Sequence, residues 1–90
     1  MRDAETRAVL ESIGANLRKL RLREGITQEA LAERAGMEVR FTQRVERGKI
    51  DIAISTLARL ARALGVAPSV LLRPAKLEAA KPGRPPQQAK

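Results

Sequence analysis

The chain contains no cysteine, histidine, tryptophan or tyrosine. It therefore lacks the usual zinc ligands, the thiol nucleophile and the commonest general base of enzymes. No residue pairs with its serines as an obvious base, and we interpret all three as surface or capping residues: Ser12, Ser55 and Ser69. We expect no enzymatic activity, and no metal ion or cofactor.

Long apolar runs are also absent, since no window approaches the roughly 18 consecutive apolar residues of a membrane span. The first residues, MRDAETRAVLES, are polar and do not form a recognisable export signal. A chain without cysteine is compatible with a reducing compartment. We expect a cytoplasmic protein, and 90 residues fit one small domain.

Acidic residues are fewer than basic ones, because 18 Lys and Arg stand against 10 Asp and Glu, which gives a net charge of +8. Such an excess favours a partner made of phosphates. The excess is uneven: residues 73–90 hold five basic groups and one acid, whereas residues 1–72 hold thirteen and nine. We interpret the scattered charges of residues 1–24 as an ordinary solvated surface.

Apolar residues recur at intervals of three and four across residues 4–24, which predicts one amphipathic helix. Gly25 is typical of a helix end, where glycine relieves the strain of a left-handed backbone. Gly14 lies inside the pattern and weakens the helix by about 1 kcal/mol relative to alanine. The expected buried stripe consists of Val9 or Leu10, Ile13, Leu17 and Leu20.

Two shorter helices follow, each ended by glycine. Thr27 can cap the second helix with its hydroxyl group, and Gly36 ends that helix. The third helix should span about residues 39–47, and Gly48 closes it. The second helix has a small buried face of Leu31, Ala32 and Ala35.

The third helix separates into two faces. Phe41 and Val45 lie four residues apart and form a packing face. Four side chains with hydrogen-bond donors share another face, at intervals of three and four: Arg40, Gln43, Arg44 and Arg47. One face of this helix is therefore expected to pack, and the other to present donors to a partner.

A fourth helix ends at Gly65, and Pro68 begins a short fifth helix that runs to about Leu72. The fold class is therefore all-α, with a compact five-helix domain over residues 4–73. Residues 74–90 are rich in Pro, Ala and Lys and have almost no bulky apolar groups, which predicts a basic disordered tail. The apolar positions of the fourth helix are Ile54, Leu57, Leu60, Ala61 and Leu64.

Four segments, taken in order, resemble the phage-repressor type of helix-turn-helix domain, which is also described as Cro-like or xenobiotic-response-element-like. The resemblance covers residues 13–72, in the segments IGANLRKLR, TQEALAERAG, VERGK and TLARLARALGV. It implies a bundle of about five helices that regulates transcription by binding double-stranded operator DNA. It further implies a homodimer on an inverted repeat, with the third helix of each copy in the major groove.

The resemblance also implies roles for individual residues. Gln28 matches a glutamine that contacts the DNA backbone, and an ordinary exposed glutamine is the alternative. Arg47 and Lys49 match positions that contact phosphate. The positions that read bases are Glu38, Val39, Arg40 and Arg44. Of these, Arg40 and Arg44 are the strongest candidates, because a guanidinium group can donate twice to guanine. Val39 can touch a thymine methyl or be a partly exposed valine without that role.

Three positions depart from the pattern of the family. Thr42 stands where an aliphatic core residue is usual, so the packing beneath the third helix is expected to differ. Phe41 can fill that gap, and the alternative is that its ring meets the DNA. Ile52 and Ala53 replace a proline and a serine, which removes the expected cap of the fourth helix, and Asp51 is the alternative cap.

Other residues are assigned to structure or to assembly. Arg21 and Glu46 match a pair that forms a salt bridge in some relatives, and we assign both to structure. Four apolar residues are the expected dimer surface: Val66, Val70, Leu71 and Leu72.

Several biological roles fit the resemblance: a restriction-modification controller protein, a phage or plasmid repressor, or an antitoxin with a toxin partner. A protein-interaction module is the alternative of a different class, and it would be expected to carry aromatic and aliphatic anchors on the third helix. In the tail, KPGRPP at residues 81–86 contains the Gly-Arg-Pro core of an AT-hook. A solvated linker is the favoured interpretation of that segment.

Overall fold

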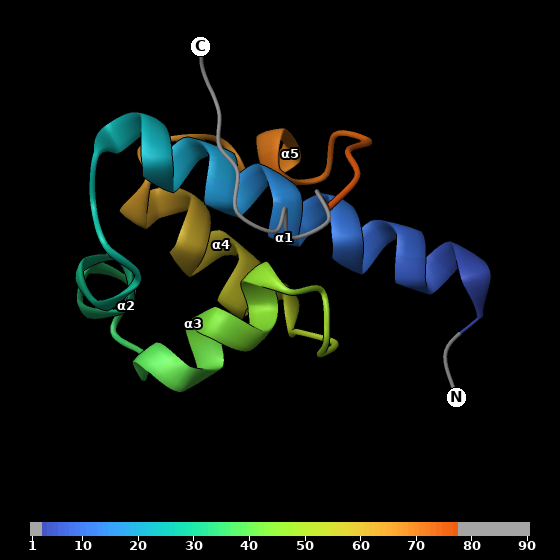
Figure 1. Ribbon diagram of the computed structural model, residues 1–90, viewed down its shortest axis with the longest axis horizontal. Helices are drawn as coiled ribbons and strands as arrows, with labels where there is room; N and C mark the ends of the chain where they lie inside the picture. Colours follow the sequence, from blue (N-terminus) through green and yellow to red (C-terminus); the bar gives the residue numbers. More distant parts are fainter. Residues whose placement is uncertain (1–2, 78–90) are drawn as a thin grey trace, which may run out of the picture.

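The computed structural model describes residues 3–77, and the regular elements in that range are all helices. Figure 1 shows α1 running along the molecule, with its N-terminal turns extending beyond the other helices. It packs against α3 and α5, while α2 packs against α3 and α4. The predicted all-α, five-helix fold is confirmed, with the helices α1 (Ala4–Glu24), α2 (Gln28–Ala35), α3 (Val39–Glu46), α4 (Ile54–Ala63) and α5 (Pro68–Leu71).

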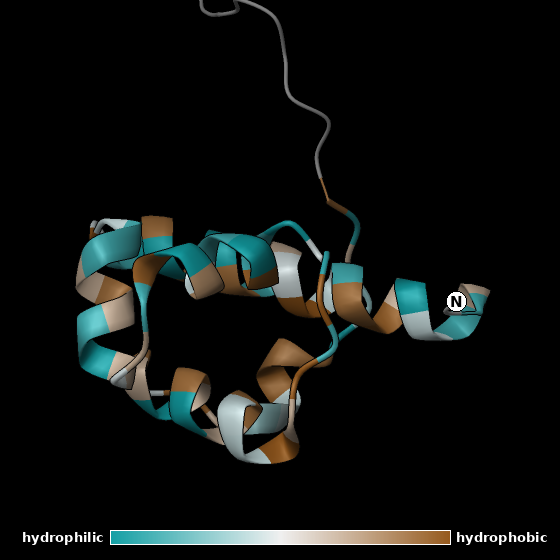
Figure 2. Cartoon of the chain, turned by 90° about the horizontal axis from the view of Figure 1, so that it is seen from below, coloured by the Kyte–Doolittle hydropathy of each residue, from teal (hydrophilic) through white to brown (hydrophobic). Residues whose placement is uncertain are grey.

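One apolar core joins the helices. Each helix carries both hydrophilic and hydrophobic residues along its length (Figure 2), and the hydrophobic sides meet in this core. Four leucines from four different helices are fully buried: Leu17, Leu31, Leu60 and Leu71. Burying one such side chain stabilises the fold by about 1.5–3 kcal/mol, so these four positions hold α1, α2, α4 and α5 together.

Two apolar residues lie differently from their predicted positions. Ile54 is 78% exposed because it is the first residue of α4 and precedes the buried stripe. Leu71 is fully buried and cannot belong to a dimer surface, whereas Leu72 beside it is exposed. In α1 the prediction left Val9 and Leu10 open for one buried position, and Leu10 is the residue that occupies it, while Val9 is exposed.

Helix ends follow the predicted chemistry in α1 and α2. Gly25 and Gly36 both adopt the left-handed conformation, with φ of 71° and 69°. The Thr27 hydroxyl accepts a hydrogen bond from the Ala30 amide at 3.0 Å, as expected. The cap of α1 is Asp3, whose carboxylate accepts from the Thr6 amide, and this hydrogen bond lowers the pKa of Asp3.

The start of α4 has no side-chain cap. Ala53 occupies the cap position, and no side chain bonds the first amides there. Asp51 therefore does not replace the missing serine. The free energy for α4 comes from its buried stripe of Leu57, Leu60 and Ala61.

Residues 74–77 differ from the predicted disordered tail. The Ser12 hydroxyl donates to the Ala75 carbonyl and accepts from the Ala75 amide, both at 3.1 Å. The Asn16 amide donates to the carbonyl of Leu71 at 3.0 Å and to that of Arg73 at 2.8 Å. Residues 73–77 thus form a strap fastened to α1, and Ser12 is a buried anchor, not a surface residue. Residues 78–90, with the KPGRPP segment, lie outside the described residues.

Gly14 is the point of closest approach between α1 and α3. A Cβ atom at this position would lie 2.5 Å from the carbonyl oxygen of Glu46 and 2.7 Å from that of Val45. Both neighbours are backbone atoms at the end of α3, so neither can rotate away. The glycine that weakens α1 as an isolated helix is therefore what allows α3 to pack against it.

Gly14→Ala distinguishes these two effects by the sign of the stability change. Helix propensity alone predicts a gain of about 1 kcal/mol, whereas overpacking against α3 predicts a loss of about 1–3 kcal/mol. We expect the loss, measured as the free energy of unfolding in urea. A gain in stability would show that α1 and α3 can separate at this point without cost.

Candidate nucleic-acid interface

The outward side of α3 and of the turn after it carries the predicted donor residues. Arg40 and Arg44 are exposed and lie one helical turn apart. Glu38, Arg47 and Lys49 are exposed as well, whereas Val39 and Gln43 are half-buried. The opposite side of the helix is buried and consists of Thr42, Val45 and Glu46. The expected division of α3 into a packing face and a donor face is therefore present.

The buried side of α3 is held to α1 by an ion pair. The Arg21 Nε donates to Glu46 Oε2 at 2.6 Å, and Arg21 Nη2 donates to Glu46 Oε1 at 3.1 Å. Both side chains are nearly removed from water, with 10% and 3% of their surfaces exposed. Arg21 also donates to the Ile26 carbonyl at 3.0 Å, which links the pair to the turn before α2. The predicted structural pair is thus a two-point contact, which fixes the orientation of both groups.

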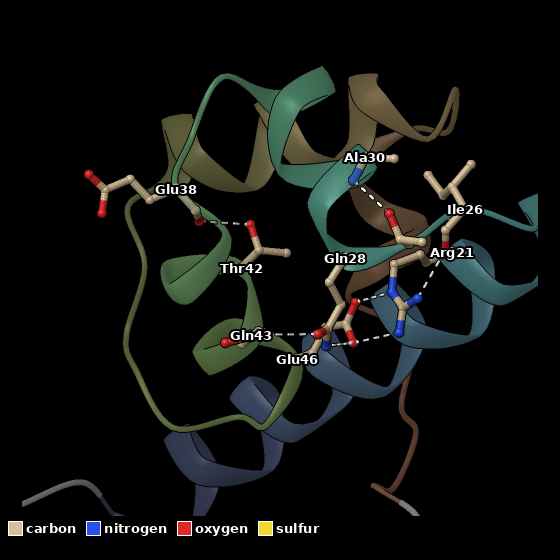
Figure 3. Close-up of polar contacts among 9 residues, drawn as sticks. Arg21, Ile26, Gln28, Ala30, Glu38, Thr42, Gln43 and Glu46 are labelled. Atoms are coloured by element: carbon tan, nitrogen blue, oxygen red, sulfur yellow. Dashed lines mark hydrogen bonds and ion pairs between the residues drawn. The ribbon is translucent and has the colours of Figure 1, made fainter.

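The same carboxylate orients the two glutamines of the site (Figure 3). Gln28 Nε2 donates to Glu46 Oε1 at 3.0 Å, and Gln43 Nε2 donates to Gln28 Oε1 at 3.2 Å. Gln28 begins α2 and Gln43 lies on α3, so the chain of hydrogen bonds joins three helices. Both glutamines are half-buried, and these hydrogen bonds orient their amide groups.

Thr42 fits the core without loss of its hydrogen bond. It is fully buried, and its hydroxyl donates to the Glu38 carbonyl of the preceding turn at 3.3 Å. Phe41 is half-buried and packs against the core cluster. This agrees with the interpretation that Phe41 packs on the core.

The turn that ends α3 determines the positions of two basic residues, Arg47 and Lys49. Gly48 adopts the left-handed conformation with φ of 67° and donates its amide to Val45 at 3.0 Å. The Lys49 amide donates to the Arg44 carbonyl at 3.1 Å, which completes a common helix-ending motif. Arg47 and Lys49 therefore lie on either side of a tight turn at the edge of the donor face.

The turn between α2 and α3 depends on a residue that the sequence did not identify. Arg59 of α4 donates to the Ala35 carbonyl at 3.1 Å and to the Gly36 carbonyl at 2.6 Å. These carbonyls have no helical partner, so the guanidinium group satisfies the end of α2. No spacing rule connects Arg59 with Gly36, and only the packing of α4 on α2 shows the contact.

The exposed groups of this site are guanidinium, amide and ammonium donors with a single carboxylate, that of Glu38. Such a set suits recognition by hydrogen bonds. Within residues 3–77, no group of three or more acidic, His or Cys side chains could hold a metal ion. None of the helices described in this range is long and apolar enough to cross a membrane.

Comparison with known proteins matches the chain to a family model, to two relatives and to a solved structure. A family model described as a helix-turn-helix domain matches residues 12–74. The chain is 39% identical over 72 residues to a hypothetical transcription factor of Neisseria meningitidis. The aligned segment covers 80% of this chain and 65% of that protein. It is 37% identical over 62 residues to an uncharacterised HTH-type transcriptional regulator of Sinorhizobium fredii, which covers 69% of this chain and 80% of that protein.

A solved structure has the same fold at similar identity. The restriction-modification controller protein C.AhdI of Aeromonas hydrophila superposes with a TM-score of 0.67 at 35% identity. The match covers 69% of this chain and 94% of that one. The expectation that the chain is not an enzyme agrees with these matches, since two are named for transcription and the third as a controller protein.

Substitution of the buried ion pair tests its structural role. Glu46→Leu leaves the Arg21 guanidinium buried without its partner, and we expect a loss of about 3–5 kcal/mol in unfolding free energy, measured in urea. The double variant Arg21→Met/Glu46→Leu removes both charges and should recover most of that loss. A double variant as unstable as the single one would show that the pair does not act through its charges.

Proposed function

The chain belongs to the helix-turn-helix domain family of transcriptional regulators, and we propose that it binds an inverted-repeat operator in double-stranded DNA as a homodimer. The observation that carries this proposal is the donor face of α3. Arg40 and Arg44 project outward from a helix whose other side is locked to α1 and α2 through Glu46. A rigid helix with exposed donors is what reading of the major groove requires.

Arg40 and Arg44 determine which DNA sequence the protein recognises. A guanidinium group donates twice to the O6 and N7 atoms of guanine, and each such pair contributes about 1–3 kcal/mol of discrimination. Val39 at the start of α3 contacts a thymine methyl, and Glu38 before it accepts from a cytosine amino group. Phe41 packs against the core with part of its side chain, and the part that stays exposed makes an apolar contact at the edge of the groove.

Four residues position the domain on the duplex: Gln28, Gln43, Arg47 and Lys49. An amide nitrogen carries two N–H groups, so Gln28 can donate to Glu46 and to a phosphate oxygen at once. Gln43 holds Gln28 in place from α3 and reaches the groove from the same amide. Arg47 and Lys49 contact the backbone beyond the end of α3, where such contacts fix register without reading sequence.

An exposed apolar surface supplies the contact between two copies. Val9, Ile54 and Leu72 are 47%, 78% and 44% exposed, and together with Ile52 they line one shallow groove. Clustered apolar side chains on a small protein mark an interaction surface. Ile54 follows the loop after α3, and in the proposed dimer the α3 helices of the two copies enter half-sites about 34–36 Å apart.

The role as a restriction-modification controller is the one that we favour among regulators of this family. C.AhdI carries that description, and the similarity covers 94% of its chain. A phage repressor or an antitoxin would use the same surfaces on DNA. A toxin partner would require a further surface.

Arg44→Ala and Arg47→Ala separate base reading from phosphate contact. The test uses the duplex that is most enriched by selection from a random pool, and variants of it with each base pair substituted in turn. Arg44→Ala should relax discrimination between bases at one position of each half-site, with a loss of about 1–3 kcal/mol in binding free energy on the original duplex. Arg47→Ala should weaken binding to all duplexes alike and make the salt dependence shallower. Fluorescence anisotropy titrations measure both effects. Uniform weakening by Arg44→Ala would assign Arg44 to the backbone.

Ile54→Asp tests the proposed dimer surface. A charge at its centre must be desolvated on association, so we expect the variant to sediment as a monomer where the unaltered protein sediments as a dimer. Leu22→Asp is the matched control, because Leu22 is 52% exposed on α1 and lies outside the Ile54 groove. An Ile54→Asp variant that remains dimeric would place the interface elsewhere.

A further inference from the structure

A groove crosses the outer face of α1, beyond the donor face of α3. Ala15 and Asn16 of α1 line it, and so does the strap of residues 73–77. The strap is fastened by the hydrogen bonds of Ser12 and Asn16. The groove is therefore a built feature of the domain, held between a helix and an anchored segment.

The charges that line this groove are almost all positive. From α1 come Arg18, Lys19 and Arg23, and from the strap come Arg73 and Lys76. These residues are exposed in the structure. Arg47 and Lys49 complete the set of seven cations that line the groove.

Among the described residues that line this groove, one is acidic. This residue is Glu46, and it is already paired with Arg21. Within residues 1–72, five basic residues and one acidic residue line the groove, whereas that range as a whole holds thirteen basic and nine acidic residues. A surface with one sign of charge attracts a partner of the opposite sign.

The groove is continuous with the proposed DNA contact. Gln28, Arg47 and Lys49 line the groove and are also the residues assigned to phosphate contact. A duplex backbone that passes these three residues therefore continues along the cations of α1 and the strap. An extended row of phosphates matches cations spread over a helix, a turn and a strap better than one compact anion does.

We propose that Arg18, Lys19, Arg23, Arg73 and Lys76 bind the phosphate backbone of the DNA that flanks each half-site. This inference rests on the proposed function and extends its footprint: α3 reads the half-site, and the α1 groove holds the neighbouring duplex. These contacts carry no sequence preference, and they strengthen binding to any operator embedded in longer DNA.

The test compares two duplexes that carry the same site, namely the sequence most enriched by selection from a random duplex pool. One ends at the outer base pairs of the site, and the other extends by about one helical turn on each side. The protein should bind the longer duplex more tightly, and its affinity for that duplex should fall more steeply with salt. The logarithmic salt slope becomes steeper by about 0.9 for every added phosphate contact.

Three single variants, Arg18→Gln, Lys19→Gln and Arg73→Gln, should each lower affinity for the longer duplex and leave the shorter one unaffected. The matched control is Arg62→Gln, an exposed arginine of α4 outside the groove, which should bind both duplexes as the unaltered protein does.

Equal affinity and equal salt slope on the two duplexes would overturn the flanking contact while leaving the proposed function intact. So would variants that weaken binding to both duplexes equally. Failure of the unaltered protein to bind either duplex at low salt would overturn the proposed function itself.

Discussion

The carboxylate of Glu46 is the group on which the candidate site depends. It lies buried where α1, α2 and α3 meet, and it accepts hydrogen bonds from Arg21 on one helix and Gln28 on another. A buried carboxylate is costly unless such partners surround it, so the three helices must adopt one relative placement to satisfy it. Gly14 makes that placement possible, since any side chain there would meet the backbone of α3.

Because the partners of Glu46 fix the position of α3, the two sides of this helix have different roles. The side of the helix that carries Glu46 and packs on the core is held in place, and for that reason the side with Arg40 and Arg44 faces in a defined direction. Fixing the position of the helix before binding reduces the entropy that a complex with DNA must lose. The same network holds Gln28 and Gln43, so the positioning groups and the reading groups belong to one rigid unit.

Features determined by neighbouring residues could be predicted from the sequence. Glycines with a left-handed backbone set the ends of α1 and α2, the Thr27 cap is local, and the two faces of α3 follow from its periodicity. Features that join distant segments could not be predicted in this way. Ser12 and Ala75 are 63 residues apart, and the contact of Gly14 with α3 depends on how two helices cross. The charges of α1 are scattered in sequence, and only the fold brings Arg18 and Arg73 to one groove.

In the proposed mode of binding, two rigid copies of α3 read one DNA sequence from both halves of a symmetric dimer. Selection of bound duplexes from a random pool tests this mode of binding, because the recovered sequences report specificity, symmetry and spacing together. We expect an inverted repeat whose half-sites are centred about one helical turn, 34–36 Å, apart. A pool that shows no enriched sequence, or a single asymmetric site, would contradict it.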